Sequence, residues 1–380
     1  MSKYIQKYNS DKTVVAAAKE RMGYIFDSFR EINVSISGGK DSTVVAWLAI
    51  NEAKRRGRKI GIVFIDEEVV YQSTVDQVEY IMDLGAGCVD RWWLQFPFLL
   101  TNAVSLEEGQ LICWEQGKHK EWVHPRNVKN VLGKPWASEK EHVGCKRKGS
   151  MIGFYDVIYN FQNQYAGAVF LVGLRAAGES LHRWRAMVKN PVEINGDNVF
   201  WGTAKGENYN LYPIYDWLAS DVWRFIYENG IRYSKVYDWQ FRKGQNPASM
   251  RVSSLIHEKS FKSICDLPEF EPKTYDRLLN RIKGMSFAQE TGKNAKMFRV
   301  SKLPKNYKTW SEYRDFLLKT YPDQERGEIF RRRFSKHLDN QYVARQQCRQ
   351  LILNDYENNL PVENKPDPRD ELIAYYKEVL

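Results

Sequence analysis

The stretch Ser37-Gly38-Gly39-Lys40-Asp41-Ser42 combines the residue types that bind phosphate at the start of a helix. The residues before it, 33–36, predict a short buried strand, and residues 43–50 predict a helix. Two glycines at such a turn let the backbone approach a ligand closely, while the helix N-terminus offers free N–H groups and partial positive charge. Lys40 adds a full charge and the serines add hydroxyl donors. We therefore predict that Ser37, Gly38, Gly39, Lys40, Asp41 and Ser42 form a phosphate site.

Two other interpretations of this stretch are a Walker A loop and an ordinary turn. A Walker A loop requires a glycine five residues before Gly39, and Val34 occupies that position, so the spacing excludes that class of loop. An ordinary turn is the second alternative, in which Asp41 only caps the following helix. The agreement of strand, loop and helix favours the phosphate site over the ordinary turn.

Other candidate residues also follow predicted strands. Residues 59–65 and 168–172 are short apolar runs; the first ends at Asp66 and the second leads into Gly173-Leu174-Arg175. Helical spacing predicts helices over 11–29, with Asp11 as N-cap, and over 72–84. Strands that alternate with helices predict an α/β fold with a doubly wound, mainly parallel sheet, which binds ligands at the carboxyl ends of its strands. There Asp66 could accept from ribose or adenine, and the Arg175 guanidinium could reach a phosphate; a structural ion pair with Glu179 is the alternative for Arg175.

The strand–helix alternation stops after about residue 240, which suggests more than one domain in a chain of 380 residues. We expect a nucleotide-binding domain over 1–235, with an irregular, lid-like insertion at about 96–149. A mostly helical domain would follow over 236–355. Residues 356–380, with three prolines among polar residues, predict a linker and a terminal helix.

The overall composition limits which binding partners and which cellular compartment we expect. Lys and Arg number 57 against 47 Asp and Glu, a net charge of +10 that suits a polyanionic partner but is also common among soluble proteins. No apolar run is long enough to cross a bilayer, so we expect no membrane partner. Five widely spaced cysteines argue against a disulfide framework and predict a reducing cytoplasm. No Cys-x-x-Cys pair occurs, which argues against an iron–sulfur cluster; His119, His124, His142 and Cys145 lack the spacing of a known zinc finger, so zinc is not expected either.

Basic and aromatic residues interleave in three stretches that suit nucleic acid: Lys118 to Lys129, His182 to Arg185, and Arg331 to His337. Arg183-Trp184-Arg185 offers phosphate contacts and base stacking, so we predict a DNA- or RNA-binding role for these three residues. Arg331-Arg332-Arg333 offers similar chemistry, but a solvated helix face explains that cluster about equally well.

Several motifs together resemble the PP-loop ATP pyrophosphatase superfamily, in its phosphoadenosine-phosphosulfate (PAPS) reductase/sulfotransferase-like branch. The resemblance implies an adenine-nucleotide α-hydrolase-like fold. The matching segments are Ser37–Ser42, Phe64-Ile65-Asp66 with Thr74, Cys145 to Lys148, Gly173-Leu174-Arg175 with Glu179-Ser180, Tyr212-Pro213-Ile214 to Trp217, and Asp221-Val222-Trp223.

Within that branch the chain looks most like the IbrA-type proteins, which are encoded beside a ParB-like partner. The resemblance therefore implies a ParB-like protein as a partner. It rests on Asp66-x-Glu68-x-x-Tyr71, Trp114, Met250-Arg251-Val252, Arg281-Ile282-x-Gly284 and Trp310-x-x-Tyr313.

The resemblance also implies roles for single residues. The loop and Lys40 would hold the β,γ-pyrophosphate of ATP, and Mg²⁺ would accompany the nucleotide on Asp41, with Asp66 or Glu68 as the second carboxylate. Lys40, Asp41 and Arg175 are the expected catalytic residues. The nucleotide-binding set implied by the resemblance adds Asp66, Glu68, Lys148, Gly173 and Glu179.

Two departures from the branch bear on function. The redox motif Glu-Cys-Gly-(Leu/Ile)-His is absent, because the last cysteine, Cys348, stands in Gln346-Gln347-Cys348-Arg349. The usual Asp-Thr-Gly after the second strand is replaced by Asp66-Glu67-Glu68, an acidic surface. The favoured hypothesis is an enzyme that cleaves ATP between the α and β phosphates to adenylylate or activate a nucleic-acid or protein acceptor. A PAPS-dependent reductase or sulfotransferase, and a nucleotide-sensing regulator without turnover, are the alternatives.

Overall fold

A six-stranded sheet forms the centre of the protein, in a computed structural model that describes residues 11–105, 108–126, 152–165, 167–176, 191–257, 260–286, 302–358 and 360–365. The strand order is β3-β2-β1-β6-β10-β9, and all neighbours are parallel except β10 and β9. The expected α/β fold with a mainly parallel sheet is confirmed. The strands are β1 (Ile32–Ser35), β2 (Ile60–Ile65), β3 (Val89–Leu94), β6 (Val169–Val172), β9 (Gly202–Lys205) and β10 (Asn208–Leu211).

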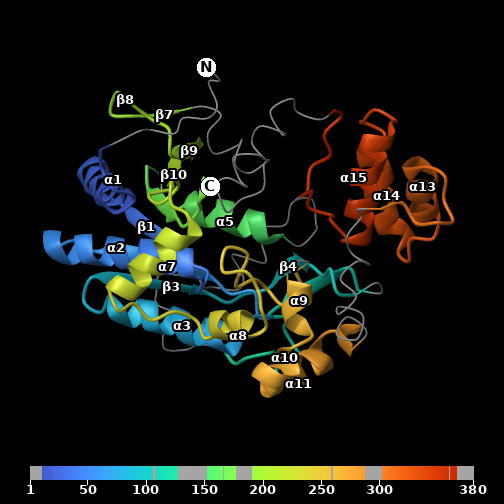
Figure 1. Ribbon diagram of the computed structural model, residues 1–380, viewed down its shortest axis with the longest axis horizontal. Coiled ribbons are helices and arrows are strands. Elements are labelled where there is room, and N and C mark those ends of the chain that lie inside the picture. The colour runs from blue at the N-terminus through green and yellow to red at the C-terminus, as the bar shows by residue number, and fades with distance from the viewer. Residues whose placement is uncertain are drawn as a thin grey trace.

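Both faces of the sheet are covered, as the apolar strands require. Along β2, Ile62 and Phe64 enter one buried cluster while Val63 enters the other, and β6 divides in the same way. Helices cover the first face (Figure 1). They are α1 (Val14–Ser28), α2 (Lys40–Arg56), α3 (Gln72–Leu84) and α7 (Ala219–Glu228).

The second face packs against α5 and a small hairpin. α5 (Phe154–Gln162) places Phe161 on this face, and the antiparallel pair β4 (Phe98–Thr101) and β5 (Gln110–Cys113) lies beside it. The region 96–149, expected to be irregular, therefore contains two strands where it is described. A second hairpin, β7 (Val192–Ile194) with β8 (Asp197–Val199), precedes β9.

The chain after β10 and α7 is helical, as the sequence predicted. Three of its helices, α13 to α15, lie at the far side of the molecule from α1 and α2 and share a small core around Phe330 (Figure 1). The helices of this part are α8 (Val236–Arg242), α9 (Phe261–Ile264), α10 (Leu267–Phe270), α11 (Pro272–Arg281), α13 (Trp310–Lys319), α14 (Gln324–Phe334) and α15 (Gln341–Ile352). The domain boundary near residue 235 stays a prediction.

The first helix begins later than the sequence suggested. Thr13, not Asp11, is its N-cap, because the Thr13 hydroxyl accepts from the backbone N–H of Ala16 at 3.2 Å. α3 has the bounds expected from its apolar spacing. Residues 366–380, including the expected terminal helix, lie outside the described part of the chain.

The strand order reverses between β1 and β6, and this point fixes the position of the site. The chain leaves β1 toward β2 and β3 on one side, and leaves β6 toward β10 on the other. Ligands of doubly wound sheets bind at such a switch point, outside the carboxyl ends of the strands. The Ser37–Ser42 loop follows β1 and Gly173 follows β6, so the two segments meet there.

Gly173 is needed for that meeting. A Cβ atom at position 173 would lie 2.7 Å from the Ser42 backbone nitrogen and 2.8 Å from the Asp41 carbonyl carbon. Both neighbours belong to the first turn of α2, which cannot move without displacing the loop. The end of β6 thus approaches α2 as closely as only glycine allows.

We expect Gly173→Ala to lower the free energy of unfolding by about 1–3 kcal/mol, because the added methyl overpacks a backbone contact. Urea unfolding measures the effect. Gly23→Ala in α1 is the matched control: the nearest atom to its Cβ is 3.7 Å away, so helix propensity should raise stability by up to about 1 kcal/mol. Equal stability of Gly173→Ala and wild type would contradict the proposed close contact.

Candidate nucleotide site at the loop after β1

The loop between β1 and α2 has the backbone of an anion site. Gly38 adopts φ 69°, the left-handed region that favours glycine, and Gly39 is the N-cap of α2 without a side-chain capping bond. The Ser37 backbone N–H donates to the Ser42 hydroxyl at 3.2 Å, and Ser42 donates to the Gly39 carbonyl at 3.1 Å. These bonds hold the loop in a tight turn that presents the N-terminus of α2.

Lys40 is the first residue of α2 and is almost completely buried, with 3% of its surface exposed. Its amine donates to Asp41 Oδ2 at 3.0 Å and to the Met250 carbonyl at 3.2 Å. Burial lowers the pKa of Lys40, and Asp41 opposes that shift. The lysine therefore depends on nearby acceptors to remain charged in the absence of a ligand.

Arg175 completes a chain of charges across the switch point. Its Nε donates to Asp41 Oδ1, and its Nη1 donates to the Trp217 carbonyl at 3.3 Å. The sequence offered Glu179 as a structural partner; the structure shows Asp41 in contact with Arg175, and Glu179 lies outside the described residues. Asp41 thus stands between two cations, Lys40 and Arg175.

A small cavity opens onto these side chains. Its volume is about 50 Å³, and it is lined by Lys40, Asp41, Gly173, Arg175, Ala248, Met250 and Arg251. Drug-sized ligands occupy pockets of roughly 300–1,000 Å³. The cavity therefore suits one phosphate-sized group and not a complete nucleotide.

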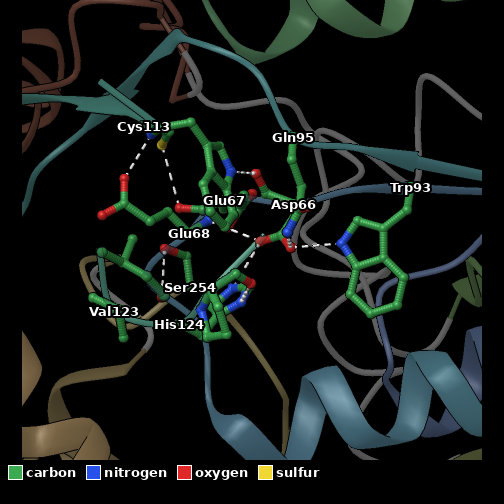
Figure 2. Close-up of polar contacts among 12 residues, drawn as sticks. Asp66, Glu67, Glu68, Trp93, Gln95, Cys113, Val123, His124 and Ser254 are labelled. Carbon is green, nitrogen blue, oxygen red and sulfur yellow. Dashed lines mark hydrogen bonds and ion pairs between the residues drawn. The ribbon is translucent and has the colours of Figure 1, made fainter. Parts of the chain in front are cut away.

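Asp66 and Glu68 were expected at the nucleotide, but the structure places them in a separate buried network, and neither lines the cavity. Asp66 is fully buried, and each of its oxygens accepts two hydrogen bonds, so the carboxylate is saturated. Figure 2 shows Trp93, Gln95 and His124 pointing toward it. The donors are Trp93 Nε1 at 2.7 Å, Gln95 Nε2 at 2.8 Å, the Glu68 backbone N–H at 3.0 Å and His124 Nε2 at 3.1 Å.

Glu68 is also fully buried and pairs with Arg281 of α11, with Nε to Oε1 at 2.7 Å and Nη2 to Oε2 at 3.2 Å. The Trp114 backbone N–H donates to the same carboxylate at 2.6 Å. Glu68 and Trp114 both have positive φ, 61° and 52°, which is uncommon for residues other than glycine. Their mutual hydrogen bond and the arginine hold the two strained positions together.

The Asp66–His124 contact is a charged pair. Burial alone would raise the pKa of Asp66, but His124 and the other donors outweigh it and the pKa lies below its usual value. Burial alone would lower the pKa of His124, because it disfavours the charged imidazolium. The contact with Asp66 more than reverses this shift, so the pKa of His124 lies above its usual value. His124 Nδ1 lies 3.1 Å from the Pro125 carbonyl, so both ring nitrogens face acceptors, as an imidazolium requires.

Burial raises the pKa of neighbouring Glu67 to about 7, with Asp66 adding to the effect. Cys113 donates to the Glu67 carbonyl at 3.2 Å, and burial raises the pKa of this thiol well above its usual value. The acidic run Asp66-Glu67-Glu68 is thus largely neutralised or paired within the fold.

These contacts limit where the predicted metal ion could bind. Among the described residues, no three His, Cys, Asp or Glu side chains are grouped to hold a metal. Asp66 has no lone pair left for Mg²⁺. Asp41 lines the cavity and fits an ion that arrives with phosphate oxygens, because Mg²⁺ commonly uses only one or two protein carboxylates.

Several predicted residues lie outside the described part of the chain. They are Cys145, Lys148, Glu179, Arg183, Trp184 and Arg185. Nucleic-acid binding and a ParB-like partner therefore stay predictions. In the other basic cluster, Arg331 donates to the Leu318 carbonyl at 2.9 Å and Arg333 to the Asp355 carbonyl at 2.7 Å, so both guanidinium groups brace the helical core.

The sequence missed three contributors to the site from the region after α7. The Tyr237 hydroxyl accepts from the Lys40 backbone N–H at 2.9 Å, Met250 supplies a carbonyl, and Arg251 lines the cavity. The only available signal was Met250-Arg251-Val252, which had served as a mark of resemblance and not as a site.

Comparisons with known proteins agree with part of the resemblance. Residues 158–268 match the phosphoadenosine phosphosulfate reductase domain, and residues 244–347 match a domain of unknown function, DUF3440. The chain is also similar to the uncharacterized protein YbdN of Escherichia coli (strain K12), with 25% identity over 333 residues, 86% of this chain and 79% of YbdN. The first match includes β6, Arg175 and Arg251, so part of the site is PAPS reductase-like in sequence.

Solved structures similar to this chain include a PAPS reductase from Candida auris in a phosphate complex, with 12% identity, 66% of this chain, 98% of that chain and a TM-score of 0.36. Yeast FAD synthetase in complex with FAD is 12% identical in sequence, and the match covers 76% of this chain and 93% of that chain with a TM-score of 0.34. NH3-dependent NAD synthetase from Campylobacter jejuni is 9% identical in sequence, and the match covers 78% of this chain and 100% of that chain with a TM-score of 0.30. TM-scores this low carry no argument about function. Separately, none of the helices described here combines the length and apolarity needed to traverse a bilayer.

The buried pair predicts a pH-dependent contribution to stability. The folded-state pKa of His124 lies above its unfolded value of 6.5, so the pair's contribution is fully present below pH 6.5 and is lost as pH rises through the folded value. We expect His124→Ala to lower the free energy of unfolding by about 3–5 kcal/mol near pH 6, because it leaves a buried carboxylate unpaired. The difference from wild type should shrink toward pH 9.

Urea unfolding from pH 5 to 9 measures that difference. His119→Ala is the matched control, because His119 is exposed and should change stability little at any pH. A His124→Ala effect that stays constant over the whole range would contradict a charged His124.

Proposed function

We propose that this chain binds ATP at the Ser37–Ser42 loop and cleaves it between the α and β phosphates, activating an acceptor and releasing pyrophosphate. The observation that carries the proposal is the arrangement of Lys40, Asp41 and Arg175 around one phosphate-sized cavity at the switch point of the sheet. This is where a doubly wound sheet binds its ligand and where a helix N-terminus favours an anion.

Each residue has a distinct part in that reaction. The Lys40 amine and the positive end of the α2 dipole would neutralise the leaving pyrophosphate, because preorganised charge stabilises the charge that develops in the transition state. Arg175, held by the Trp217 carbonyl, would orient the α-phosphate with its guanidinium. Asp41 would hold Mg²⁺ together with phosphate oxygens, and the ion would supply further neutralisation of charge.

The similarity of residues 158–268 to the PAPS reductase domain supports a second candidate, a PAPS-type ligand at the same loop. Reduction through Cys348 has no support, because this thiol is fully buried and burial raises its pKa to about 12. A thiolate is the form that reacts. Transfer of a sulfuryl or adenylyl group remains compatible with the site.

A third candidate is a nucleotide-sensing regulator that works with a ParB-like partner, as the resemblance to IbrA-type proteins implies. It would use the same loop contacts without turnover. In the enzyme proposal, the acceptor of the activated group is either a nucleic acid or a protein.

The deciding experiment follows AMP and pyrophosphate after incubation of the purified chain with ATP and Mg²⁺, alone and with DNA or RNA. Release of pyrophosphate, with AMP either free or bonded to the acceptor, supports the enzyme. Tight ATP binding with no product under any condition would favour the regulator. A parallel incubation with PAPS separates the second candidate, because transfer would release adenosine bisphosphate instead.

We expect Lys40→Ala to weaken binding of ATP and Mg²⁺ about 10- to 150-fold, since a charge-assisted hydrogen bond contributes roughly 1.5–3 kcal/mol. Isothermal titration calorimetry measures the change, with circular dichroism to confirm the fold. Lys19→Ala removes an exposed lysine from α1 and should bind ATP as wild type does. Unchanged ATP affinity in folded Lys40→Ala would refute the phosphate site.

Cys348→Ala should leave nucleotide-dependent activity within about twofold of wild type, because the buried thiol is protonated and donates to the Trp310 carbonyl. Product formation from ATP and from PAPS is the measurement, with the variant's fold checked by its unfolding curve. Loss of PAPS turnover in a folded Cys348→Ala variant would restore the reductase interpretation.

A further inference from the structure

We propose that Arg251 is a third anion-binding residue of this site and acts with Lys40 and Arg175 on the polyanionic end of the nucleotide. The inference rests on the proposed nucleotide site and deepens it. It adds a residue that lies more than 200 positions after the loop in the sequence. It also specifies the ligand class as a nucleotide that carries at least two linked tetrahedral oxyanions.

The placement of Arg251 is the first observation. The cavity at the loop is lined by Lys40, Asp41, Gly173 and Arg175 together with Ala248, Met250 and Arg251. We call residues 248–252 the strap. The Lys40 amine donates to the Met250 carbonyl at 3.2 Å, so the strap is in direct contact with the phosphate-binding lysine.

The backbone of the strap is fixed from α8. The Gln240 amide donates to the Arg251 carbonyl at 2.7 Å, and its oxygen accepts from the Arg251 N–H at 3.1 Å. Gln240 is buried, with 2% of its surface exposed. The Gln240 side chain therefore satisfies both the N–H and the carbonyl of Arg251, and it fixes the backbone position from which the Arg251 side chain extends.

Tyr237, one turn earlier on α8, joins the strap to the loop. Its hydroxyl accepts from the Lys40 backbone N–H at 2.9 Å and also hydrogen-bonds to the Val252 backbone. The strap is thus tied to the loop at Met250 through Lys40 and at Val252 through Tyr237. Such support from buried neighbours is typical of a residue preorganised for binding.

The charges around the cavity determine what it can take. The charged side chains that line it are Lys40, Asp41, Arg175 and Arg251. Arg251 is exposed while Lys40 is buried, so the arginine lies at the mouth and the lysine at the base. A ligand that contacts both positions needs two linked oxyanions, and the pyrophosphate of ATP or the phosphosulfate of PAPS would place one oxyanion at the base and another at the mouth.

The test titrates inorganic pyrophosphate, inorganic phosphate and AMP, with Mg²⁺, into wild type and Arg251→Gln by calorimetry. We expect Arg251→Gln to weaken pyrophosphate binding about 10-fold or more, and AMP binding less than about 3-fold. Arg251→Lys should recover part of the affinity, because it keeps the charge but not the guanidinium fork. Arg242→Gln removes an exposed arginine of α8 outside the cavity and is the matched control.

The outcomes separate this inference from the proposed function. Equal pyrophosphate affinity in wild type and folded Arg251→Gln overturns the role of Arg251 and leaves the loop site intact. An equal loss of pyrophosphate affinity in Arg242→Gln also overturns it, because the effect would then come from overall charge. Failure of wild type to bind pyrophosphate, ATP or PAPS overturns both the inference and the proposed function. ATP and PAPS titrated in parallel show which oxyanion pair the arginine favours.

Discussion

The buried charge of Lys40 is the constraint on which the site depends. A cation at the first residue of a helix is disfavoured by the helix dipole, and burial adds a desolvation cost. The fold offsets that cost with Asp41 and the Met250 carbonyl, and balances Asp41 in turn with Arg175. An anion in the cavity would complete the compensation. If the loop binds an anion as proposed, the arrangement would be more favourable in the complex than in the free protein, as expected where stability has been exchanged for function.

The second polar centre shows how the acidic run after β2 is accommodated without a ligand. Asp66 receives donors from β3, from the segment after it and from the region beyond β5, while Glu68 takes Arg281 from α11. A buried carboxylate requires such partners, since removal of one would leave an uncompensated charge. The network joins the carboxyl end of β2 to the hairpin and to α11, and it leaves the loop after β1 as the polar centre with a cavity.

The sequence predicted those parts of the fold and site that rest on local signals. Strand β1, the glycine turn and α2 are contiguous, and apolar spacing predicted α3 with its observed bounds. Arg175 followed from its position after a buried strand. The buried network around Asp66 was not foreseen for a physical reason: a strand-end position suggests a ligand, but the donors Trp93 and His124 lie 27 and 58 residues away. Nothing local in the sequence shows that such donors will converge.

Arg251, Tyr237 and Gln240 were missed for the same reason, because their roles exist only once the strap lies against the loop. The helical region after α7 therefore supplies more than a cover for the sheet. It provides the Met250 carbonyl to Lys40, the Tyr237 hydroxyl to the first N–H of α2, and Arg281 to Glu68. A change of composition near residue 235 can mark a domain boundary, but the polar groups that compensate the loop come from both sides of it. The nucleotide site, as proposed, is consequently a property of the parallel sheet together with the region around α8 and the strap, and not of the sheet alone.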